Sequence, residues 1–316
     1  LAKLDVATSE NTIKESIAQI YIQILYAAES VRVNENTLQV SIAQRDRGQE
    51  LLNAGSIAKS DFAQLEAQVS TDRYQLVTAQ ATLQDYKLQL KQLLELDGEN
   101  EMNVYLPKLS DENVLAPLPA KKDVYVSALA IRPEIEASKL NVEASELGID
   151  IAKSSYFPTI SLSAGIGTNH TSGSDFTFGE QVKNGWNNSI GLSVSVPIFN
   201  NRQTKSAVQK AKLQRETDML SLLDEQKALY KTIESLWLDA NSAQQRYAAA
   251  NEKLRSTQIS YDLISEQFNL GMKNTVELLT EKNNLLQAQQ EQLQAKYMAI
   301  LNTQLLKFYQ GDKLTL

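Results

Sequence analysis

The chain has 316 residues, no cysteine, a single histidine (His170) and a formal net charge of −7, from 31 Lys and Arg against 38 Asp and Glu. The lack of cysteine excludes disulfides and thiolate metal sites, and one histidine argues against a histidine-based metal centre or catalytic triad. Because no basic run is present to bind phosphates, we expect no nucleic-acid partner. The sequence contains no recognisable nucleophile–base pair, phosphate loop or metal cluster, so we expect neither enzymatic activity nor a cofactor.

Residues 1–96 are predicted to form a helical hairpin with a glycine at its tip. Helix-forming residues run through this segment, and Gly55 interrupts them within "ELLNAGSIAKSDFAQLEAQ". A glycine suits the end of a helix because it adopts a positive φ at little cost. Ser60 and Asp61 then suit the start of the returning helix, where hydroxyls and carboxylates meet free backbone N–H groups.

The next two segments, 97–131 and 132–155, differ in composition. The first contains "DGENEMNVYLPKLSDENVLAPLPAKK", whose proline, asparagine and aspartate residues break the helical pattern. A disordered linker is one interpretation of this stretch, against which stand its apolar residues, such as Val104 and Leu106. The second segment is predicted to be a helix that opens with Arg132-Pro133-Glu134, since proline is tolerated in a first helical turn.

Residues 156–200 change to a period of two. In "FPTISLSAGIGTNH" and "NNSIGLSVSVPIF", aliphatic side chains alternate with small or polar ones over residues 159–168 and 188–198. This pattern predicts two strands with one aliphatic face, joined into a hairpin by the polar loop "TSGSDFTFGEQVKNG". Strands of about ten residues are long enough to cross a bilayer in a tilted β-barrel, although a soluble amphipathic hairpin has the same pattern.

Residues 201–316 are predicted to form a second helical hairpin that repeats the first. Superimposing Gly271 on Gly55 gives an offset of 271 − 55 = 216, and the helical parts then align without a gap. The helix over 203–270 would be roughly 100 Å long at 1.5 Å per residue, and Thr275 suits the start of its return helix. A heptad seam on the long helix is expected to face a partner helix. Its members are Leu229, Ile233, Leu236, Ala240, Ala243, Tyr247, Ala250, Leu254, Thr257, Tyr261, Ile264 and Phe268.

In this order and spacing, the motifs resemble those of the TolC-type outer-membrane efflux protein family. The likeness covers nearly the whole chain and rests on "IRPEIEAS", "YFPTISLSAGIG", "LSVSVPIFNNRQTKSAVQKAK" and the paired tips "NAGSIAKSDF" and "NLGMKNTVEL". It implies a mainly α fold with a β-hairpin. Long coiled-coil hairpins would form an α-barrel tunnel, the strands would join a trimeric outer-membrane β-barrel, and segment 97–131 would lie around the equator of the tunnel.

The number of strands departs from the family pattern. The family has four strands per chain, two in each repeat, whereas this sequence has a single β-hairpin. The helix near Arg132 opens the second repeat, and 132 − 216 = −84, so roughly 85 residues of the first repeat are expected to precede Leu1. The sequence therefore predicts an N-terminally truncated segment, which supplies half of each protomer's barrel wall.

The resemblance makes the two tips a candidate gate. Lys273 is expected to close the gate in an ion pair with Asp61, while Glu277, alone or with Glu281, would form an acidic ring. Phe268 stands at a tyrosine-type position and lacks the hydroxyl. A charged and solvated helix start explains the same residues, because exposed ion pairs contribute only about 0–1 kcal/mol. The predicted gate residues are Gly55, Ser60, Asp61, Phe268, Gly271, Lys273, Glu277 and Glu281.

The family likeness implies a homotrimer in the outer membrane of a Gram-negative bacterium, with most of the chain in the periplasm and the barrel in contact with outer-membrane lipid. It would be the passive exit duct of a tripartite efflux or type I secretion system. An inner-membrane pump would supply energy, and a periplasmic adaptor (membrane fusion) protein would dock at the tips. A soluble periplasmic coiled-coil adaptor or scaffold is the alternative. The strand pair over 159–199 discriminates against it, since a scaffold needs no strands of bilayer length.

Overall fold

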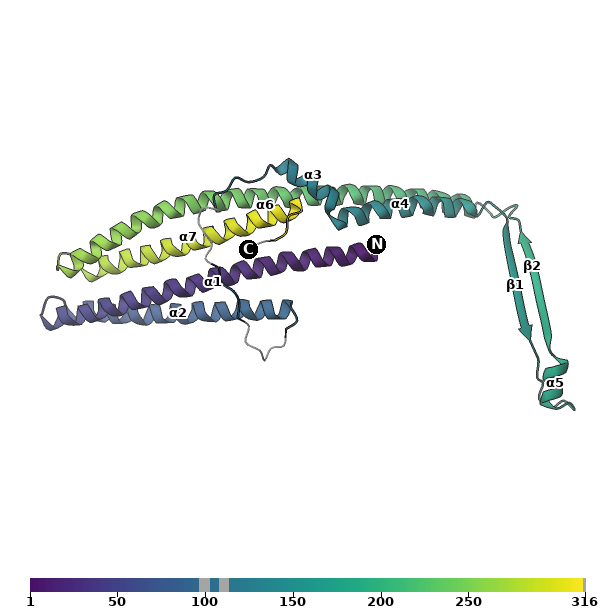
Figure 1. The fold of residues 1–316 in the computed structure, drawn as a ribbon, viewed down its shortest axis with the longest axis horizontal. Coiled ribbons are helices and arrows are strands. Elements are labelled where there is room, and N and C mark those ends of the chain that lie inside the picture. The colour runs from purple at the N-terminus through teal and green to yellow at the C-terminus, as the bar shows by residue number, and fades with distance from the viewer. Residues whose placement is uncertain (97–102, 108–113, 315–316) are drawn as a thin grey trace. The chain divides into compact units, whose positions relative to one another are not determined.

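The computed structural model describes residues 1–96, 103–107 and 114–314 (Figure 1). The chain divides into two compact units. The first unit joins Leu1–Glu136 to Gln226–Leu316 and contains both helical hairpins, and the second unit, Ala137–Glu225, contains the strands. The predicted fold class, mainly α with one β-hairpin, is confirmed.

Long helices make up most of both units. The elements in chain order are α1 (Ala2–Asn53), α2 (Lys59–Leu93), α3 (Lys121–Ile131), α4 (Pro133–Ser154), β1 (Thr159–Gly167), α5 (Phe178–Asn184), β2 (Asn187–Ser195), α6 (Gln203–Asn269) and α7 (Thr275–Gln310). The longest, α6, has 67 residues and contributes to both units. Within the described residues, none of the helices is both long enough and apolar enough to cross a membrane.

The two hairpin tips have the same backbone conformation, as the internal repeat predicts. Gly55 and Gly271 both have a φ of +72°. At the first tip, the N–H of Ser56 donates to the carbonyl five residues earlier at 2.8 Å, and that of Gly55 to the carbonyl three residues earlier at 2.9 Å. At the second tip, Met272 and Gly271 make the equivalent hydrogen bonds, both at 2.9 Å. This Schellman motif ends α1 and α6 at the predicted glycines.

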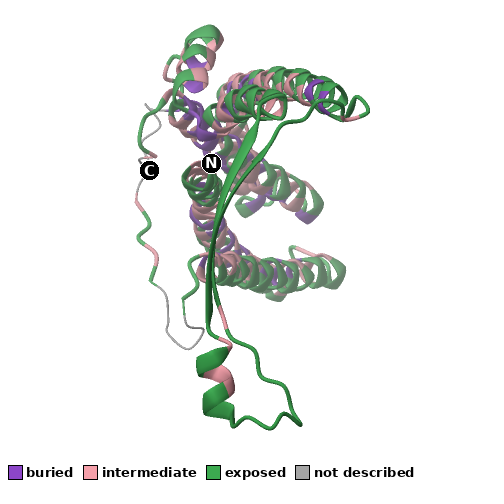
Figure 2. Cartoon of the chain, turned by 90° about the vertical axis from the view of Figure 1, so that its right-hand side faces the viewer, coloured by how far each residue is buried: buried purple, intermediate pink, exposed green. Residues whose placement is uncertain are grey.

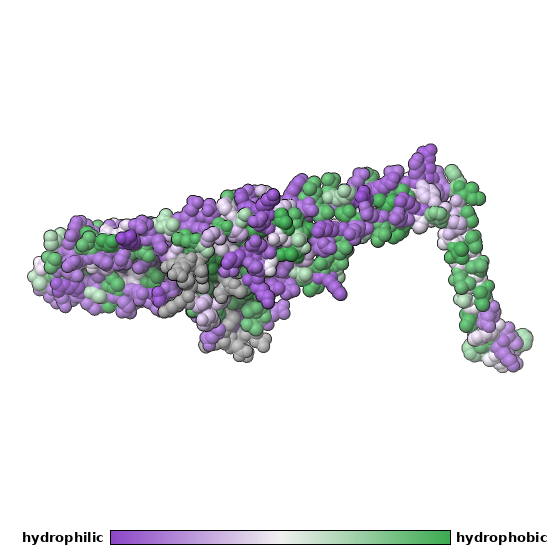
Figure 3. Space-filling view, turned by 45° about the horizontal axis from the view of Figure 1, so that its top comes forward, coloured by the Kyte–Doolittle hydropathy of each residue, from purple (hydrophilic) through white to green (hydrophobic). Residues whose placement is uncertain are grey.

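The antiparallel strands β1 and β2 are paired in a register that places similar side chains opposite one another. Leu162 pairs with Leu192, and the neighbouring positions pair Ser161 with Ser193. Aliphatic side chains therefore share one face, and small or polar ones share the other. Figure 2 shows the pair exposed along its length, and Figure 3 shows an apolar band on it. The predicted hairpin is confirmed, and none of the described residues covers its aliphatic face.

Two details of the second unit differ from the prediction. β2 ends at Ser195 instead of continuing to residue 198, because Pro197 has no N–H to donate to a strand ladder. The predicted irregular loop contains the short helix α5. Its start is stabilised by a capping box, in which the backbone N–H of Thr177 donates to Glu180 Oε2 at 2.9 Å. So short a helix has too few residues to show a helical period in the sequence.

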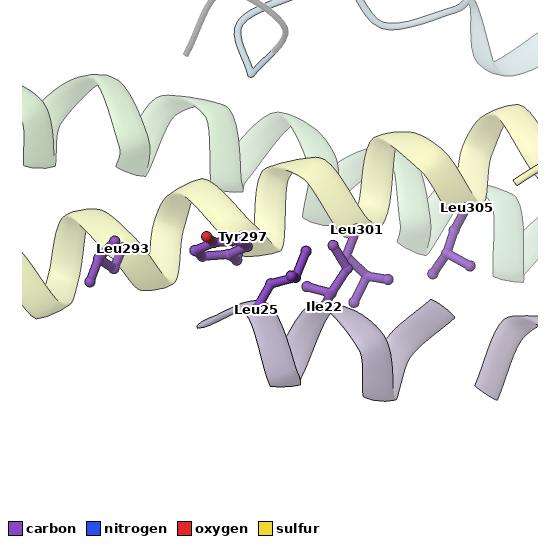
Figure 4. Packing of buried hydrophobic residues seen from close by; sticks show 6 residues of the cluster. All are labelled: Ile22, Leu25, Leu293, Tyr297, Leu301 and Leu305. Carbon is purple, nitrogen blue, oxygen red and sulfur yellow. The ribbon is translucent and has the colours of Figure 1, made fainter. Parts of the chain in front are cut away.

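Facing apolar stripes hold the two helical hairpins together in the first unit. Ile22 and Leu25 of α1 point toward Tyr297 and Leu301 of α7 (Figure 4). The predicted seam of α6 is confirmed, since seven of its twelve members are buried and the other five are half-buried. The buried members are Leu229, Ile233, Ala240, Ala243, Tyr247, Ala250 and Phe268.

Residues 114–120 of segment 97–131 are anchored on α6. Gln244 Nε2 donates to the carbonyls of Val114 and Ala116 at 2.9 and 2.8 Å, and Trp237 Nε1 donates to the carbonyl of Pro119 at 3.1 Å. These contacts do not fit the linker interpretation for residues 114–120. Residues 103–107 are also described, and the carbonyl of Tyr105 accepts from Tyr21 Oη of α1 at 2.7 Å. The rest of that expectation, on residues 97–102 and 108–113, lies outside the described residues.

Arg132 has a larger structural role than the helix start that the sequence predicts. Pro133 takes the first position of α4 as predicted, but Arg132 is buried between α3 and α4 with an extended backbone. Its guanidinium donates to Glu15 Oε1 at 2.8 Å and lies 3.6 Å from the ring centroid of Tyr309. Burial raises the pKa of Tyr309 to about 12. Arg132 thus joins α1 and α7 to the α3–α4 junction, in addition to opening a helix.

Candidate functional site

The tips of the two helical hairpins meet in a small apolar cluster. Leu65 of α2, Phe268 of α6 and Leu278 of α7 are buried against one another. Phe268 is only 2% exposed, so its ring makes apolar contacts. A tyrosine at this position would also supply a hydroxyl group. On the first hairpin, Gly48 leaves room for this packing, because a Cβ there would stand 2.3 Å from Leu65 Cδ1.

A pocket of about 360 Å³ lies between the two tips beside this cluster. Both hairpins contribute to it: Leu51, Ser56, Ile57 and Asp61 from the first, and Phe268, Gly271, Met272, Lys273, Asn274, Thr275 and Glu277 from the second. Five of the eight predicted gate residues therefore lie around one small space.

The expected ion pair between Lys273 and Asp61 is not formed. Lys273 Nζ instead lies 2.6 Å from Glu277 Oε1, four residues along the same hairpin. The hydrogen bond from Lys273 lowers the pKa of the Glu277 carboxyl. The carboxylate of Asp61 accepts the backbone N–H of Ala58 at 3.3 Å at the start of α2. The prediction was wrong because each charge finds a partner close by along the chain, at the start of the return helix of its own hairpin.

The start of α7 also differs in its capping residue. Asn274 is the N-cap, and its Oδ1 accepts the N–H of Glu277 at 2.9 Å, while Glu277 Oε2 accepts the N–H of Asn274 at 3.2 Å. Thr275, which was expected to cap the helix, is its first residue and is buried. Its hydroxyl oxygen has no hydrogen-bond partner among the residues that the structure describes. Glu277 serves the helix start as predicted.

The remaining predicted gate residues do not bridge the hairpins. Ser60 is exposed in the first turn of α2. Glu281 Oε2 accepts from the hydroxyl of Ser260 at 3.1 Å, and Glu281 Oε1 accepts from Asn284 Nδ2 at 3.4 Å. Ser260, Glu281 and Asn284 all belong to the second hairpin. An acidic ring of Glu277 and Glu281 stays a prediction.

Two polar links between the hairpins were missed by the sequence analysis. Gln44 Nε2 of α1 donates to Tyr261 Oη of α6 at 2.8 Å. Arg47 Nη2 of α1 donates to the carbonyl of Asn269 at 3.4 Å. Burial raises the pKa of Tyr261, so its hydroxyl stays protonated at neutral pH. Tyr261 was placed on the seam of α6, but a seam position alone does not reveal its polar partner.

A third link is buried further from the tips. Lys282 Nζ of α7 binds Asp72 Oδ2 of α2 and the hydroxyl of Ser41 of α1, and that hydroxyl also binds Asp72. Gln68 Nε2 donates to Asp72 Oδ1 at 2.9 Å. The side chains of Lys282 and Asp72 are each 3% exposed. Burial is the largest influence on Lys282 and lowers its pKa.

A sequence signal for this network exists. Asp72 stands three residues after Val69 and four before Leu76, and Lys282 stands three after Leu279 and four before Leu286. Each charge thus occupies a seam position between leucine or valine residues that repeat every seven. A charge on each of two seams is the pattern that indicates a buried ion pair.

Alanine at either tip glycine is expected to lower the free energy of unfolding by about 1–2 kcal/mol, because a Cβ is strained at positive φ. No atom of the described residues lies within 4 Å of a Cβ built on Gly55 or Gly271, so the backbone conformation decides the cost. Thermal unfolding of the full-length protein followed by circular dichroism measures it. Gly148→Ala within α4 is the control, since its Cβ also meets no atom and its φ is helical. That control is expected to gain about 0.5–1 kcal/mol, and a loss there equal to that at the tips would contradict the prediction.

With this geometry established, comparison with known proteins decides the family. A family model described as "Outer membrane efflux protein" matches residues 124–311, more than half of the chain. The chain belongs to the outer membrane efflux protein family.

Individual members of the outer membrane efflux protein family match over most of the chain. The outer membrane efflux protein BepC of Brucella suis biovar 1 is 26% identical over 294 residues, covering 92% of this chain and 61% of that protein. The outer membrane protein TolC of Escherichia coli (strain K12) is 25% identical over 308 residues, covering 93% and 60%. The solved structure of CusC has a TM-score of 0.82 at 18% identity, covering 98% of this chain and 71% of that chain. The chain spans about three fifths of the length of these two curated relatives.

These matches confirm the predicted outer membrane efflux protein family and the predicted outer-membrane location. The family is one of transport proteins and not of enzymes. The described residues contain no cluster of histidine, cysteine, aspartate and glutamate that would hold a metal ion.

Proposed function

We propose that the full-length protein is a passive channel through the outer membrane, the exit duct of a tripartite efflux or type I secretion system. The observation that carries this proposal is the strand pair β1–β2, which has one continuous aliphatic face that none of the described residues covers. Its strands are nine residues each, close to the length that crosses a bilayer when tilted. Family membership supports the same function, as does the similarity in fold to CusC, a protein that forms a transmembrane channel.

The strand pair also supports a homotrimer in contact with outer-membrane lipid. In the described residues the sheet has only β1 and β2, so the outer edge of each strand lacks a ladder partner. Lipid does not hydrate free backbone N–H and C=O groups, and strands therefore cross a membrane only in a closed barrel. Strands of neighbouring protomers would supply the missing partners. Aliphatic side chains would face lipid and the small, polar face would line the passage.

The helical tips support gating and docking. The two hairpins meet there through one apolar cluster and a few polar links, a contact small enough to open. We place the gate at this contact and expect a periplasmic adaptor protein to dock on it, with an inner-membrane pump as the source of energy. Met272 and Leu270, 70% and 69% exposed at the second tip, are apolar groups that such a partner would cover. A soluble adaptor or scaffold explains the helices but leaves the apolar strand pair without a role.

Planar-bilayer recording tests the channel. The full-length protein is expected to give discrete, long-lived conductance steps, because its barrel can close. A segment restricted to residues 1–316 is expected to give none, since its unpaired strand edges are not tolerated in lipid. Absence of conductance from the full-length protein, with trimers verified by size exclusion, would overturn the proposed function. Stable pores from the segment would refute the incomplete barrel.

A further inference from the structure

The network of Ser41, Asp72 and Lys282 joins three helices and both hairpins. Lys282 comes from α7, whereas Asp72 and Ser41 come from the two helices of the first hairpin. Along α7, Lys282 lies between Leu278 of the tip cluster and Leu293, where the apolar contact with Ile22 and Leu25 begins. The network therefore separates the tip contact from the main apolar contact between the hairpins.

The internal repeat shows that this link is one-sided. With the offset of 216, Ser41 corresponds to Thr257 and Asp72 corresponds to Ala288, which is fully buried. Lys282 corresponds to Glu66, an exposed acid on α2. The repeat-equivalent positions therefore cannot form the same ion pair, because Ala288 replaces the anion and Glu66 replaces the cation. The link thus ties α7 to the first hairpin without a symmetric copy elsewhere in the two repeats.

A buried ion pair differs from an apolar seam in how it responds to separation. Within the protein, the attraction between the charges roughly offsets the loss of their hydration, so the pair adds little net stability. When the helices part and water enters, both charges regain favourable hydration. Exposing an apolar seam to water has no such compensation and is unfavourable. The pair still demands one register, because a shifted charge would remain buried without its partner.

We propose that the network is a releasable link of the gate, in which Lys282 is a positioning residue that sets the register of α7 on the first hairpin and allows that contact to open. This inference rests on the proposed function for its role, but the link between hairpins is testable apart from transport. Charges at the seam would make the contact specific when closed and easy to hydrate when open. An apolar replacement would keep the closed contact and hinder its separation.

The decisive variant is Lys282→Met with Asp72→Leu in the full-length protein. It keeps the seam filled and leaves no buried charge, a replacement that is often neutral or stabilising. The single variant Lys282→Met leaves Asp72 buried without its cation and is expected to loosen the contact. The matched control is Lys253→Met with Glu291→Leu, which removes an ion pair of 2.7 Å inside the second hairpin, with side chains 47% and 42% exposed.

Tip separation is measured by pulsed electron spin resonance between labels at Ala54→Cys and Leu270→Cys. These repeat-equivalent positions are exposed, and residues 1–316 contain no cysteine that would compete for the label. The double variant is expected to reduce the population with long label distances about tenfold, and to lower open-channel conductance events by a similar factor. The single variant should broaden the distances, and the control should match the unmodified protein.

Label distances and conductance that are unchanged in the double variant would overturn the link, showing that the pair serves packing only. The link would also be overturned if the label distances of the double variant broadened as much as those of the single variant. An apolar pair would then not hold the closed contact in place of the charges. Trimer assembly by size exclusion excludes misfolding as the cause. If the unmodified protein conducts no current, the channel proposal fails, while the label distances still decide whether the link controls tip separation.

Discussion

Replacing Arg132 by methionine is expected to lower the free energy of unfolding by about 3 kcal/mol, the lower end of the range for breaking a buried ion pair. Arg132 is 5% exposed, while its partner Glu15 keeps 23% exposure and so recovers part of its hydration. The variant also loses the stacking of the guanidinium on Tyr309. Thermal unfolding of the full-length protein in detergent, followed by circular dichroism, measures the loss.

Two further variants identify the cause of that loss. Arg132→Lys keeps the positive charge but not the planar group, so it should recover only part of the stability if stacking contributes. Arg215→Met is the matched control, since Arg215 pairs with Glu146 at 2.6 Å while 37% exposed, and its loss should stay under about 1 kcal/mol. Equal losses for Arg132→Met and Arg215→Met would show that burial of the pair has no consequence.

Arginine at Leu192 is expected to impair barrel assembly by about 2–4 kcal/mol, because it would place a charge on the lipid-facing side near the middle of the membrane. Leu192 stands at the centre of β2 opposite Leu162, on the aliphatic face. Assembly is measured as the fraction of heat-modifiable oligomer recovered on refolding into lipid vesicles over a urea series. The expected loss of assembly depends on the face of β2 that carries the arginine, and not on the presence of an arginine in β2 as such.

The neighbouring residue provides the control. Ser193 pairs with Ser161 on the small, polar face, which is proposed to line the passage. Ser193→Arg should therefore assemble with a much smaller loss than Leu192→Arg, although both place the same side chain on adjacent residues. If the two variants lose assembly equally, the aliphatic face is not the one that meets lipid.

The features that the sequence alone determined are those decided by neighbours along the chain. The turns at Gly55 and Gly271 follow from a glycine at positive φ, and their equality follows from the repeat. The shared aliphatic face of the two strands follows from strict alternation, since a slip by one residue would bring every aliphatic side chain to the wrong face. The capping role of Glu277 is equally local, because its partner is only three residues away.

Only the tertiary structure decided which charges meet. Lys273 was expected to reach Asp61 on the other hairpin, but it binds Glu277 within its own turn. Lys282 was not singled out, yet it is buried in an ion pair with Asp72, 210 residues away along the chain. The physical reason is that a long charged side chain reaches several partners of similar energy. The packing of the hairpins alone selects which contact excludes water.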